Sequence, residues 1–129
     1  MINALHEAWH CAAAFEKQQP VNRIHLWPYP GTGWGDPDND PADDFTRAVI
    51  TLVPNIAMPE WPSDTDKSVL DELSPGEVER ARPEATRLVD EVIDRSGVAA
   101  IARNALPLGF LSGSSAKRVY DAAKRTVSS

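Results

Sequence analysis

The segment from residue 3 to residue 19 repeats its apolar positions with the period of an α-helix. Its predicted apolar face is formed by Leu5, Ala8, Cys11, Ala12 and Phe15. Asn3 is a candidate N-cap, and Pro20 is expected to stop the helix. The opposite side is polar, which indicates a helix that packs against the protein on one side and is open on the other.

The rest of the chain predicts one short strand, a long turn-rich segment and several further helices. Alternation favours a strand at 21–27, and the many prolines and glycines at 28–41 favour a loop with a short strand around Trp34. Helices are predicted at 42–57, from Ser63 onward, from Pro75 to about Arg95, at 98–106 and at 114–125. The order of elements predicts an α+β fold that is mostly α-helical, with a short strand or hairpin beside the first helix. A single domain over residues 1–129 is expected.

Individual residues predict where these helices begin and end. Ser63 is an expected N-cap, and Ser74-Pro75-Gly76-Glu77 has the pattern of a capping box with proline at the first helical position. Pro54 lies inside the 42–57 helix and is expected to bend or end it, and Pro83 predicts a kink in the long helix. Gly97 is expected to separate that long helix from the next one.

Composition limits the classes of function. The chain has 129 residues and a net charge of −6, and its lysines and arginines form no stripe, so nucleic-acid binding is not expected. No run of about 18 apolar residues is present, which predicts no membrane span. The N-terminus does not have the pattern of a signal peptide, and a lone cysteine, Cys11, makes no internal disulfide. These features together predict a cytoplasmic protein, with Cys11 as a core residue.

Residues 6–10, His-Glu-Ala-Trp-His, match the pattern HExxH. Histidines four residues apart lie on one face of a helix, so the imidazoles of His6 and His10 can bind one metal ion. The glutamate between them, Glu7, can act as the base that deprotonates a water molecule at the metal. The alternative is a pair of surface histidines on an amphipathic helix with Glu7 solvated. The paired histidines and the intervening glutamate favour the metal site.

A catalytic zinc ion usually has three protein ligands, so a third side chain is needed. His25 lies on the predicted strand, where a core or edge histidine is the simpler interpretation. Carboxylates near predicted helix starts or between prolines are Asp43, Asp44, Glu60, Asp64 and Asp66. Their spacing alone does not choose among them.

The run from His6 to Ala14 resembles the HEAGHA opening of the peptidase domain in FtsH-type ATP-dependent zinc proteases, and more specifically the small stand-alone peptidases related to them. Residues 20–26 resemble the short strand of that family, and residues 105–113 resemble the tail of the small forms. The resemblance implies a zincin-like helix bundle, Zn²⁺ as cofactor and an aspartate ligand at the start of a later helix. In the matching segment, 62–70, that ligand is Asp66, with Asp64 as the second choice.

The resemblance and the motif together predict a zinc metalloendopeptidase, a hydrolase with gluzincin- or aspzincin-like chemistry. His6, His10 and Asp66 would hold the zinc ion, and Glu7 would be the catalytic base. The expected partner is a polypeptide substrate, extended along an exposed strand edge at 21–27 or near Trp34. A separate ATPase or a homo-oligomer is a further expected partner, since this sequence contains no ATPase module.

Two alternatives stay open. One is a peptidase-like module that is catalytically weak or inactive and serves in binding or regulation. The other is suggested by Ala57-Met58-Pro59-Glu60, which resembles a segment of the ImmA/IrrE-type zinc peptidases that cleave repressors. That resemblance implies a third ligand from residues 43–60, such as Asp44.

Overall fold

The computed structural model describes residues 2–26 and 43–128. Its elements are α1 (Ile2–Glu16), β1 (Arg23–His25), α2 (Asp44–Ala57), α3 (Asp64–Glu72), α4 (Pro75–Arg87), the π-helical turn η2 (Leu88–Val92), α5 (Arg95–Ala105), β2 (Phe110–Ser112) and α6 (Gly113–Ser128). The chain is mostly helical (74%) with a two-stranded antiparallel sheet, which confirms the prediction of a mostly α-helical α+β fold. The loop predicted at 28–41, with its strand around Trp34, lies outside the described residues.

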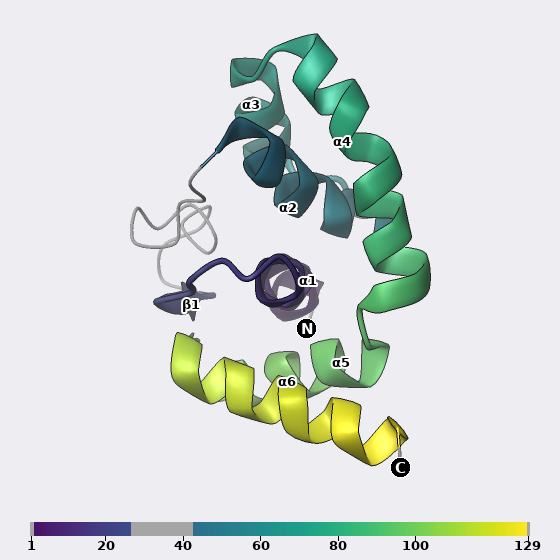
Figure 1. The fold of residues 1–129 in the computed structure, drawn as a ribbon. Coiled ribbons are helices and arrows are strands. Elements are labelled where there is room, and N and C mark those ends of the chain that lie inside the picture. Colours follow the sequence, from purple (N-terminus) through teal and green to yellow (C-terminus); the bar gives the residue numbers. More distant parts are fainter. Residues whose placement is uncertain (1, 27–42, 129) are drawn as a thin grey trace.

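Helix α1 runs through the middle of the other helices (Figure 1). Helices α2, α3 and α4 lie on one side of it and α5 and α6 on the other, and α1 contacts both α2 and α5 directly. Its buried residues are Ala4, Ala8, Trp9, His10, Cys11, Ala12, Ala13 and Ala14. Most of these side chains are small, which lets neighbouring helices approach the α1 axis closely from several directions.

The burial of α1 differs from the prediction, in which the polar side of this helix is open. His10 belongs to the predicted open side but is only 1% exposed, whereas Leu5 and Phe15 of the predicted apolar side are only partly buried. The prediction treated both histidines as facing solvent. A polar side chain can be buried at little cost when its hydrogen bonds are made within the protein. Here α2 and α3 supply those bonds and cover the histidine side of α1.

The ends of α1 follow from local hydrogen bonding. The helix already includes Ile2, so Asn3 is an interior residue and the prediction that it is the N-cap is wrong. At the other end Gln18 adopts the left-handed conformation, with φ of 53°. Its N–H donates to the carbonyl of Phe15 (3.1 Å), and the N–H of Gln19 donates to that of Ala14 (2.8 Å). This is a Schellman-type C-cap, and it turns the chain toward β1 before Pro20 is reached.

Three later helices begin at residues whose side chains cap the first turn. The backbone N–H of Thr46 donates to the side chain of Asp43 (2.7 Å), that of Asp66 to the hydroxyl of Ser63 (3.1 Å) and that of Glu77 to the hydroxyl of Ser74 (3.2 Å). The predicted caps Ser63 and Ser74 are confirmed. Pro54 does not end α2, which continues through it to Ala57.

The junction between η2 and α5 corrects the role predicted for Gly97. Asp94 is the N-cap and accepts hydrogen bonds from the N–H groups of Ser96 (2.8 Å) and Gly97 (3.2 Å), so α5 begins at Arg95 and contains the glycine in its first turn. A Cβ atom on Gly97 would lie 2.4 Å from Cδ1 of Tyr120. The glycine therefore does not break a helix; it lets the Tyr120 ring of α6 pack on α5.

The sheet joins segments that are far apart in the sequence. Strand β1 pairs with β2 in antiparallel register, with Ile24 opposite Leu111, so the short element beside α1 is not a hairpin. The prediction missed β2 because Pro107 and Gly109 indicated a turn that leads directly into the last helix. Gly113 follows β2 at once, and a Cβ atom there would lie 1.6 Å from the carbonyl oxygen of Val21. Only glycine allows this close contact between the two backbones.

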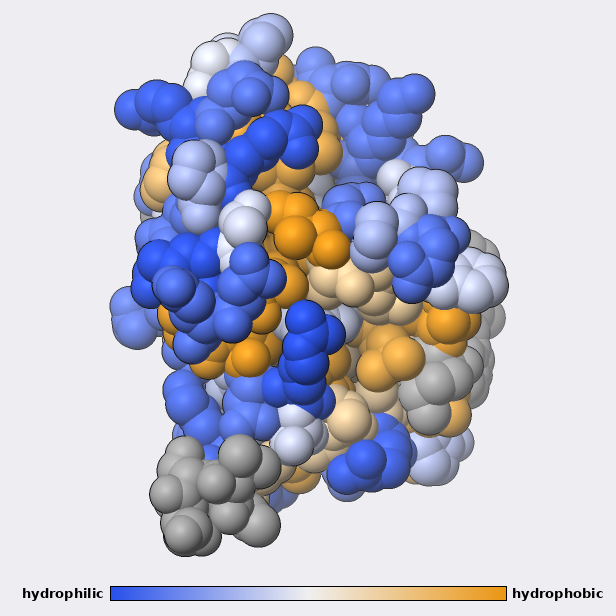
Figure 2. Space-filling view, turned by 90° about the vertical axis from the view of Figure 1, so that its right-hand side faces the viewer, coloured by the Kyte–Doolittle hydropathy of each residue, from blue (hydrophilic) through white to orange (hydrophobic). Residues whose placement is uncertain are grey.

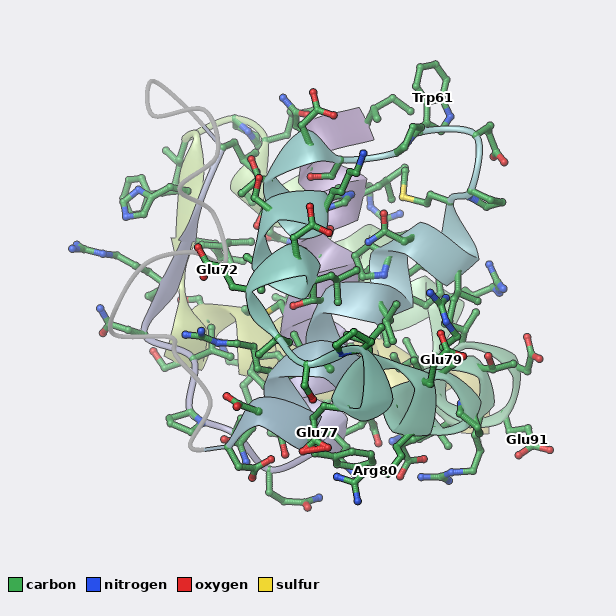
Figure 3. The ribbon with its side chains drawn as sticks, turned by 90° about the horizontal axis from the view of Figure 1, so that it is seen from above. Trp61, Glu72, Glu77, Glu79, Arg80 and Glu91 are labelled. Atoms are coloured by element: carbon green, nitrogen blue, oxygen red, sulfur yellow. The ribbon has the colours of Figure 1, made fainter. Side chains whose placement is uncertain are left out.

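On the face shown in Figure 2, hydrophilic side chains surround hydrophobic ones that are visible in the middle. The large apolar residues exposed in the described part of the chain are Ile2, Trp61, Leu108 and Phe110. Trp61, 52% exposed, projects outward from the connection between α2 and α3 (Figure 3). Glu77 and Arg80 lie together on the outer side of α4 in the same view and form an ion pair. No described helix combines the length and the apolar character that crossing a membrane requires.

Two helical glycines provide a matched test of the packing between α5 and α6. Gly97→Ala places a methyl group against the Tyr120 ring, and we expect this overpacking to lower the free energy of unfolding by about 1–3 kcal/mol. Gly76 lies in the first turn of α4, where an added Cβ atom would have no neighbour within 4 Å, so Gly76→Ala should be neutral or stabilise the protein by up to about 1 kcal/mol. Urea unfolding of both variants checks this. Equal effects of the two substitutions would contradict the packing described.

Candidate metal centre

His6 and His10 of α1 meet Asp66 of α3 in one cluster. Nε2 of His6 lies 2.8 Å from Oδ2 of Asp66, and Nε2 of His10 lies 3.1 Å from Oδ1. One carboxylate thus contacts both imidazoles, whose ring planes are nearly perpendicular at 81°. The three candidate ligand atoms lie within 4.8 Å of one another. Across residues 2–26 and 43–128, no other group of three or more His, Cys, Asp or Glu side chains converges in this way.

The first turn of α3 sets the position of Asp66. Ser63 caps the helix and accepts a hydrogen bond from the backbone N–H of Asp66, which fixes the residue at the third helical position. Asp66 is 6% exposed and is the one buried residue of α3, while Asp64 on the same turn is exposed. The structure therefore brings the first-choice aspartate to the histidines and leaves the second choice, Asp64, at the surface.

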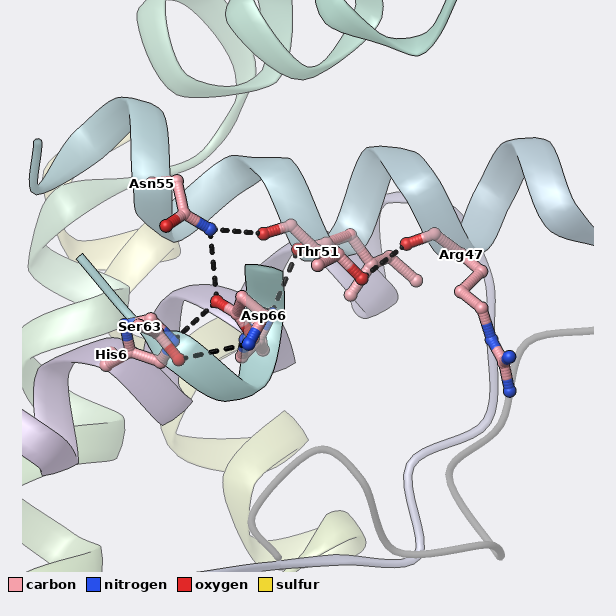
Figure 4. A network of polar contacts seen from close by, with 8 residues as sticks. His6, Arg47, Thr51, Asn55, Ser63 and Asp66 are labelled. Atoms are coloured by element: carbon pink, nitrogen blue, oxygen red, sulfur yellow. Dashed lines mark hydrogen bonds and ion pairs between the residues drawn. The ribbon is translucent and has the colours of Figure 1, made fainter. Parts of the chain in front are cut away.

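Helix α2 supplies a second layer of contacts. Nδ1 of His10 lies 2.9 Å from the carbonyl oxygen of Ile50 and donates a hydrogen bond to it. The side-chain amide of Asn55 donates both to Oδ2 of Asp66 (3.1 Å) and to the carbonyl of Thr51 (2.8 Å), as Figure 4 shows. Such contacts fix the orientation of a ligand side chain and the tautomer of a histidine.

The electrostatics of the cluster follow from these contacts. Burial by itself lowers the pKa of His10, but the charge of Asp66, its hydrogen bond and the charge of Glu7 outweigh burial and raise the pKa to about 9. Burial by itself raises the pKa of Asp66, but its charge and hydrogen-bond interactions with His10 and His6 hold that pKa well below its usual range. Both ring nitrogens of His10 face oxygen acceptors. The arrangement therefore favours positive charge between the imidazoles and the carboxylate, which a proton or a divalent cation can supply.

Glu7 and Cys11 lie beside the cluster on the same helix. Oε2 of Glu7 is shielded from solvent, and the Glu7 charge is close enough to raise the pKa of His10. Burial, with a smaller contribution from Glu7, raises the pKa of the Cys11 thiol far above its usual range. Cys11 is fully buried and does not belong to the cluster of His6, His10 and Asp66, which confirms the prediction of a core residue.

The other candidate ligands are not brought to the histidines. Asp44 and Glu60 are exposed, and Asp43 caps α2, so the ligand set with Asp44 that the second resemblance implied is not formed. His25 lies on β1 with its ring 6.5 Å from that of Phe110. Trp9, between the two histidines in sequence, packs inward at 4% exposure with the guanidinium of Arg95 over its ring.

Sequence reasoning missed the contacts made by Ile50 and Asn55. A backbone carbonyl has no sequence signature of its own, and Asn55 near the end of an apolar helix is typical of a solvated position. One signal was present in the sequence. Pro54, directly before Asn55, has no N–H, so the carbonyl four residues earlier, that of Ile50, loses its helical donor and can accept a bond from another side chain.

Comparison with known proteins adds no relative: no protein-family model, no curated protein and no solved structure matches this chain. The function is therefore inferred from the residues and the geometry of the cluster alone.

The ion pair between His10 and Asp66 predicts a pH dependence of stability in metal-free protein. The folded-state pKa of His10 is raised from 6.5 to about 9, so the stabilisation is fully present below about pH 6.5 and is lost as the pH rises through 9. Between about pH 6.5 and about pH 10, we expect the free energy of unfolding to fall by up to about 3 kcal/mol more in wild type than in Asp66→Asn. Urea unfolding in the presence of a chelator measures both. Parallel profiles would contradict the ion pair.

Proposed function

We propose that this chain is a zinc-dependent metallopeptidase in which His6, His10 and Asp66 hold the metal ion and Glu7 is the catalytic base. The observation that carries the proposal is the position of Asp66. This residue lies 60 and 56 positions from the two histidines in sequence, yet its carboxylate contacts Nε2 of both. Such convergence supports Asp66 as the third ligand that the HExxH motif lacks in the sequence alone.

The donor set suits zinc. Catalytic zinc sites often use two imidazole nitrogens and one carboxylate oxygen as ligands, and they keep a fourth coordination position for water or substrate. The hydrogen bond from Nδ1 of His10 to Ile50 leaves Nε2 as the nitrogen that can bind a metal. Asn55 similarly holds the carboxylate of Asp66 in place. When zinc binds, the proton shared in the ion pair between His10 and Asp66 would be released.

The chemistry then divides between the ion and the protein. A zinc ion in this site would acidify a water molecule and polarise the carbonyl of a peptide bond. Glu7, one residue from His6, would accept the proton of that water and deliver it to the leaving amine. The His6 side chain is 12% exposed and that of His10 only 2%, so a polypeptide substrate would reach the site from the His6 side.

A second candidate function has a specific observation in its favour. His10 and Asp66 are almost fully buried, which is more typical of a closed structural metal site than of an open catalytic one. On this alternative the chain is a metal-binding module without turnover, with a role in binding or regulation. Metal binding is common to both functions, and hydrolysis separates them.

The ligand set predicts a difference between two aspartates on one helical turn. Asp66→Asn should weaken zinc binding by more than about 100-fold, because loss of a ligand costs more than loss of an outer contact. Asp64→Asn removes the same charge from an exposed position and should leave affinity unchanged. Metal analysis of the purified proteins and competition with a chromogenic chelator measure both. A wild-type protein that binds no zinc, or equal losses in the two variants, would overturn this ligand set.

The role of Glu7 predicts a separation of binding from catalysis. Glu7→Gln keeps the size of the side chain and removes the base, so zinc should stay bound while peptide hydrolysis falls by about 10²–10⁴-fold. Cleavage of an unfolded protein substrate, followed by mass spectrometry, is the measurement, with the His6→Ala variant as the metal-deficient control. Zinc-loaded wild type that shows no more hydrolysis than Glu7→Gln would favour the non-catalytic module instead.

A further inference from the structure

Pro54 is the least expected residue of α2. It lies inside the helix and is buried, although proline in a helix interior removes one backbone hydrogen bond and costs about 3 kcal/mol. In an α-helix the N–H of residue 54 would donate to the carbonyl of residue 50, and proline has no N–H. The carbonyl of Ile50 therefore lacks its usual helical donor.

That same carbonyl receives the side chain of His10. Nδ1 of His10 donates to the Ile50 oxygen at 2.9 Å, across the buried contact between α1 and α2. His10 is 1% exposed, so water does not offer Nδ1 an alternative acceptor. Because the proline ring also crowds the carbonyl four residues earlier, it favours a carbonyl that is turned away from the helix axis, toward a neighbouring donor.

We infer that Pro54 is a positioning residue of the metal centre. By depriving Ile50 of its helical donor, it provides the acceptor that holds the proton of His10 on Nδ1 and leaves Nε2 for the metal ion. Pro54 touches neither metal nor substrate in this role and acts only through Ile50 and His10. The inference rests on the proposed function, since it concerns the same metal site.

A second proline provides the matched control. Pro83 also lies inside a helix, α4, and likewise deprives a carbonyl of its donor, that of Glu79. Both Pro83 and Glu79 are exposed, and neither belongs to the cluster of His6, His10 and Asp66. Pro54→Ala and Pro83→Ala therefore make the same chemical change in two helices, and only the first returns an N–H to the acceptor of His10.

Zinc affinity is the first readout. Competition with a chromogenic chelator should show that Pro54→Ala binds zinc about 10–100-fold more weakly than wild type, the range found when an outer contact of a histidine ligand is lost. Pro83→Ala should bind as wild type does. Replacing residue 54 with lactic acid, which has the side chain of alanine but no N–H, should restore most of the affinity. A purely structural role of the proline ring would not give that recovery.

The protonation state of His10 is the second readout, and it does not need metal. In ¹⁵N-histidine spectra of metal-free wild type, the Nδ1 proton of His10 should exchange slowly with water, and in Pro54→Ala it should exchange faster. Circular dichroism shows whether the variant is folded. If it is not, a rapidly exchanging Nδ1 proton in wild type is by itself enough to overturn the inference.

The outcomes for this inference and for the proposed function differ. Wild type that binds no zinc refutes the proposed function. Wild type that binds zinc, with Pro54→Ala binding equally well and keeping a slowly exchanging His10 proton, refutes the role of Pro54 and leaves the metal site intact.

Discussion

The contact of one carboxylate with two imidazoles links α3 to α1, and the candidate metal site depends on it. Helix α3 buries a single residue, and that residue is Asp66. Leu70 packs against the core and the C-cap residue Leu73 belongs to it, and the contacts of Asp66 with His6, His10 and Asn55 attach the first turn of α3. Removing one partner from such a buried pair leaves an uncompensated charge, which destabilises a protein strongly. The same contact is thus a structural link and a candidate metal site, and metal affinity and stability are expected to change together.

Helix α1, which carries both histidines, lies at the centre of the fold (Figure 1). An HExxH helix at the surface would need only one packed side, but α1 is surrounded by α2, α3, α5 and α6 and has alanines at many of its contacts. Its histidines are covered because Asp66 of α3 and the carbonyl of Ile50 in α2 make hydrogen bonds with their ring nitrogens. Of the two histidines, His6 is the more exposed, so the cluster lies nearest to solvent toward the start of the helix.

The sequence predicted those features that depend on nearby residues. Ser63 and Ser74 begin helices because their hydroxyl groups reach the N–H three residues later, which is a local effect. Asn3 and Gly97 were misread because tertiary structure overrides local preference: the helix extends past one, and the other makes room for Tyr120. Strand β2 was missed because its pairing with β1 joins residues almost ninety positions apart. The HExxH motif predicted two of the cluster's members, and the choice of Asp66 came from a resemblance rather than from spacing.

Where local preference and the observed structure disagree, the disagreement itself is informative. A proline in the interior of a buried helix is unfavourable by itself, and natural sequences keep such features mainly where something else in the fold uses them. In α2 the proline removes the helical donor of one carbonyl, that of Ile50, and this carbonyl accepts a hydrogen bond from Nδ1 of His10, the more buried histidine. The neighbouring Asn55 then holds the carboxylate that faces the same histidine. Two consecutive residues of α2 thus act on the two sides of the ion pair between His10 and Asp66. Outer contacts of this kind fix the orientation of both the imidazole and the carboxylate, which is the role that they have around metal-binding side chains.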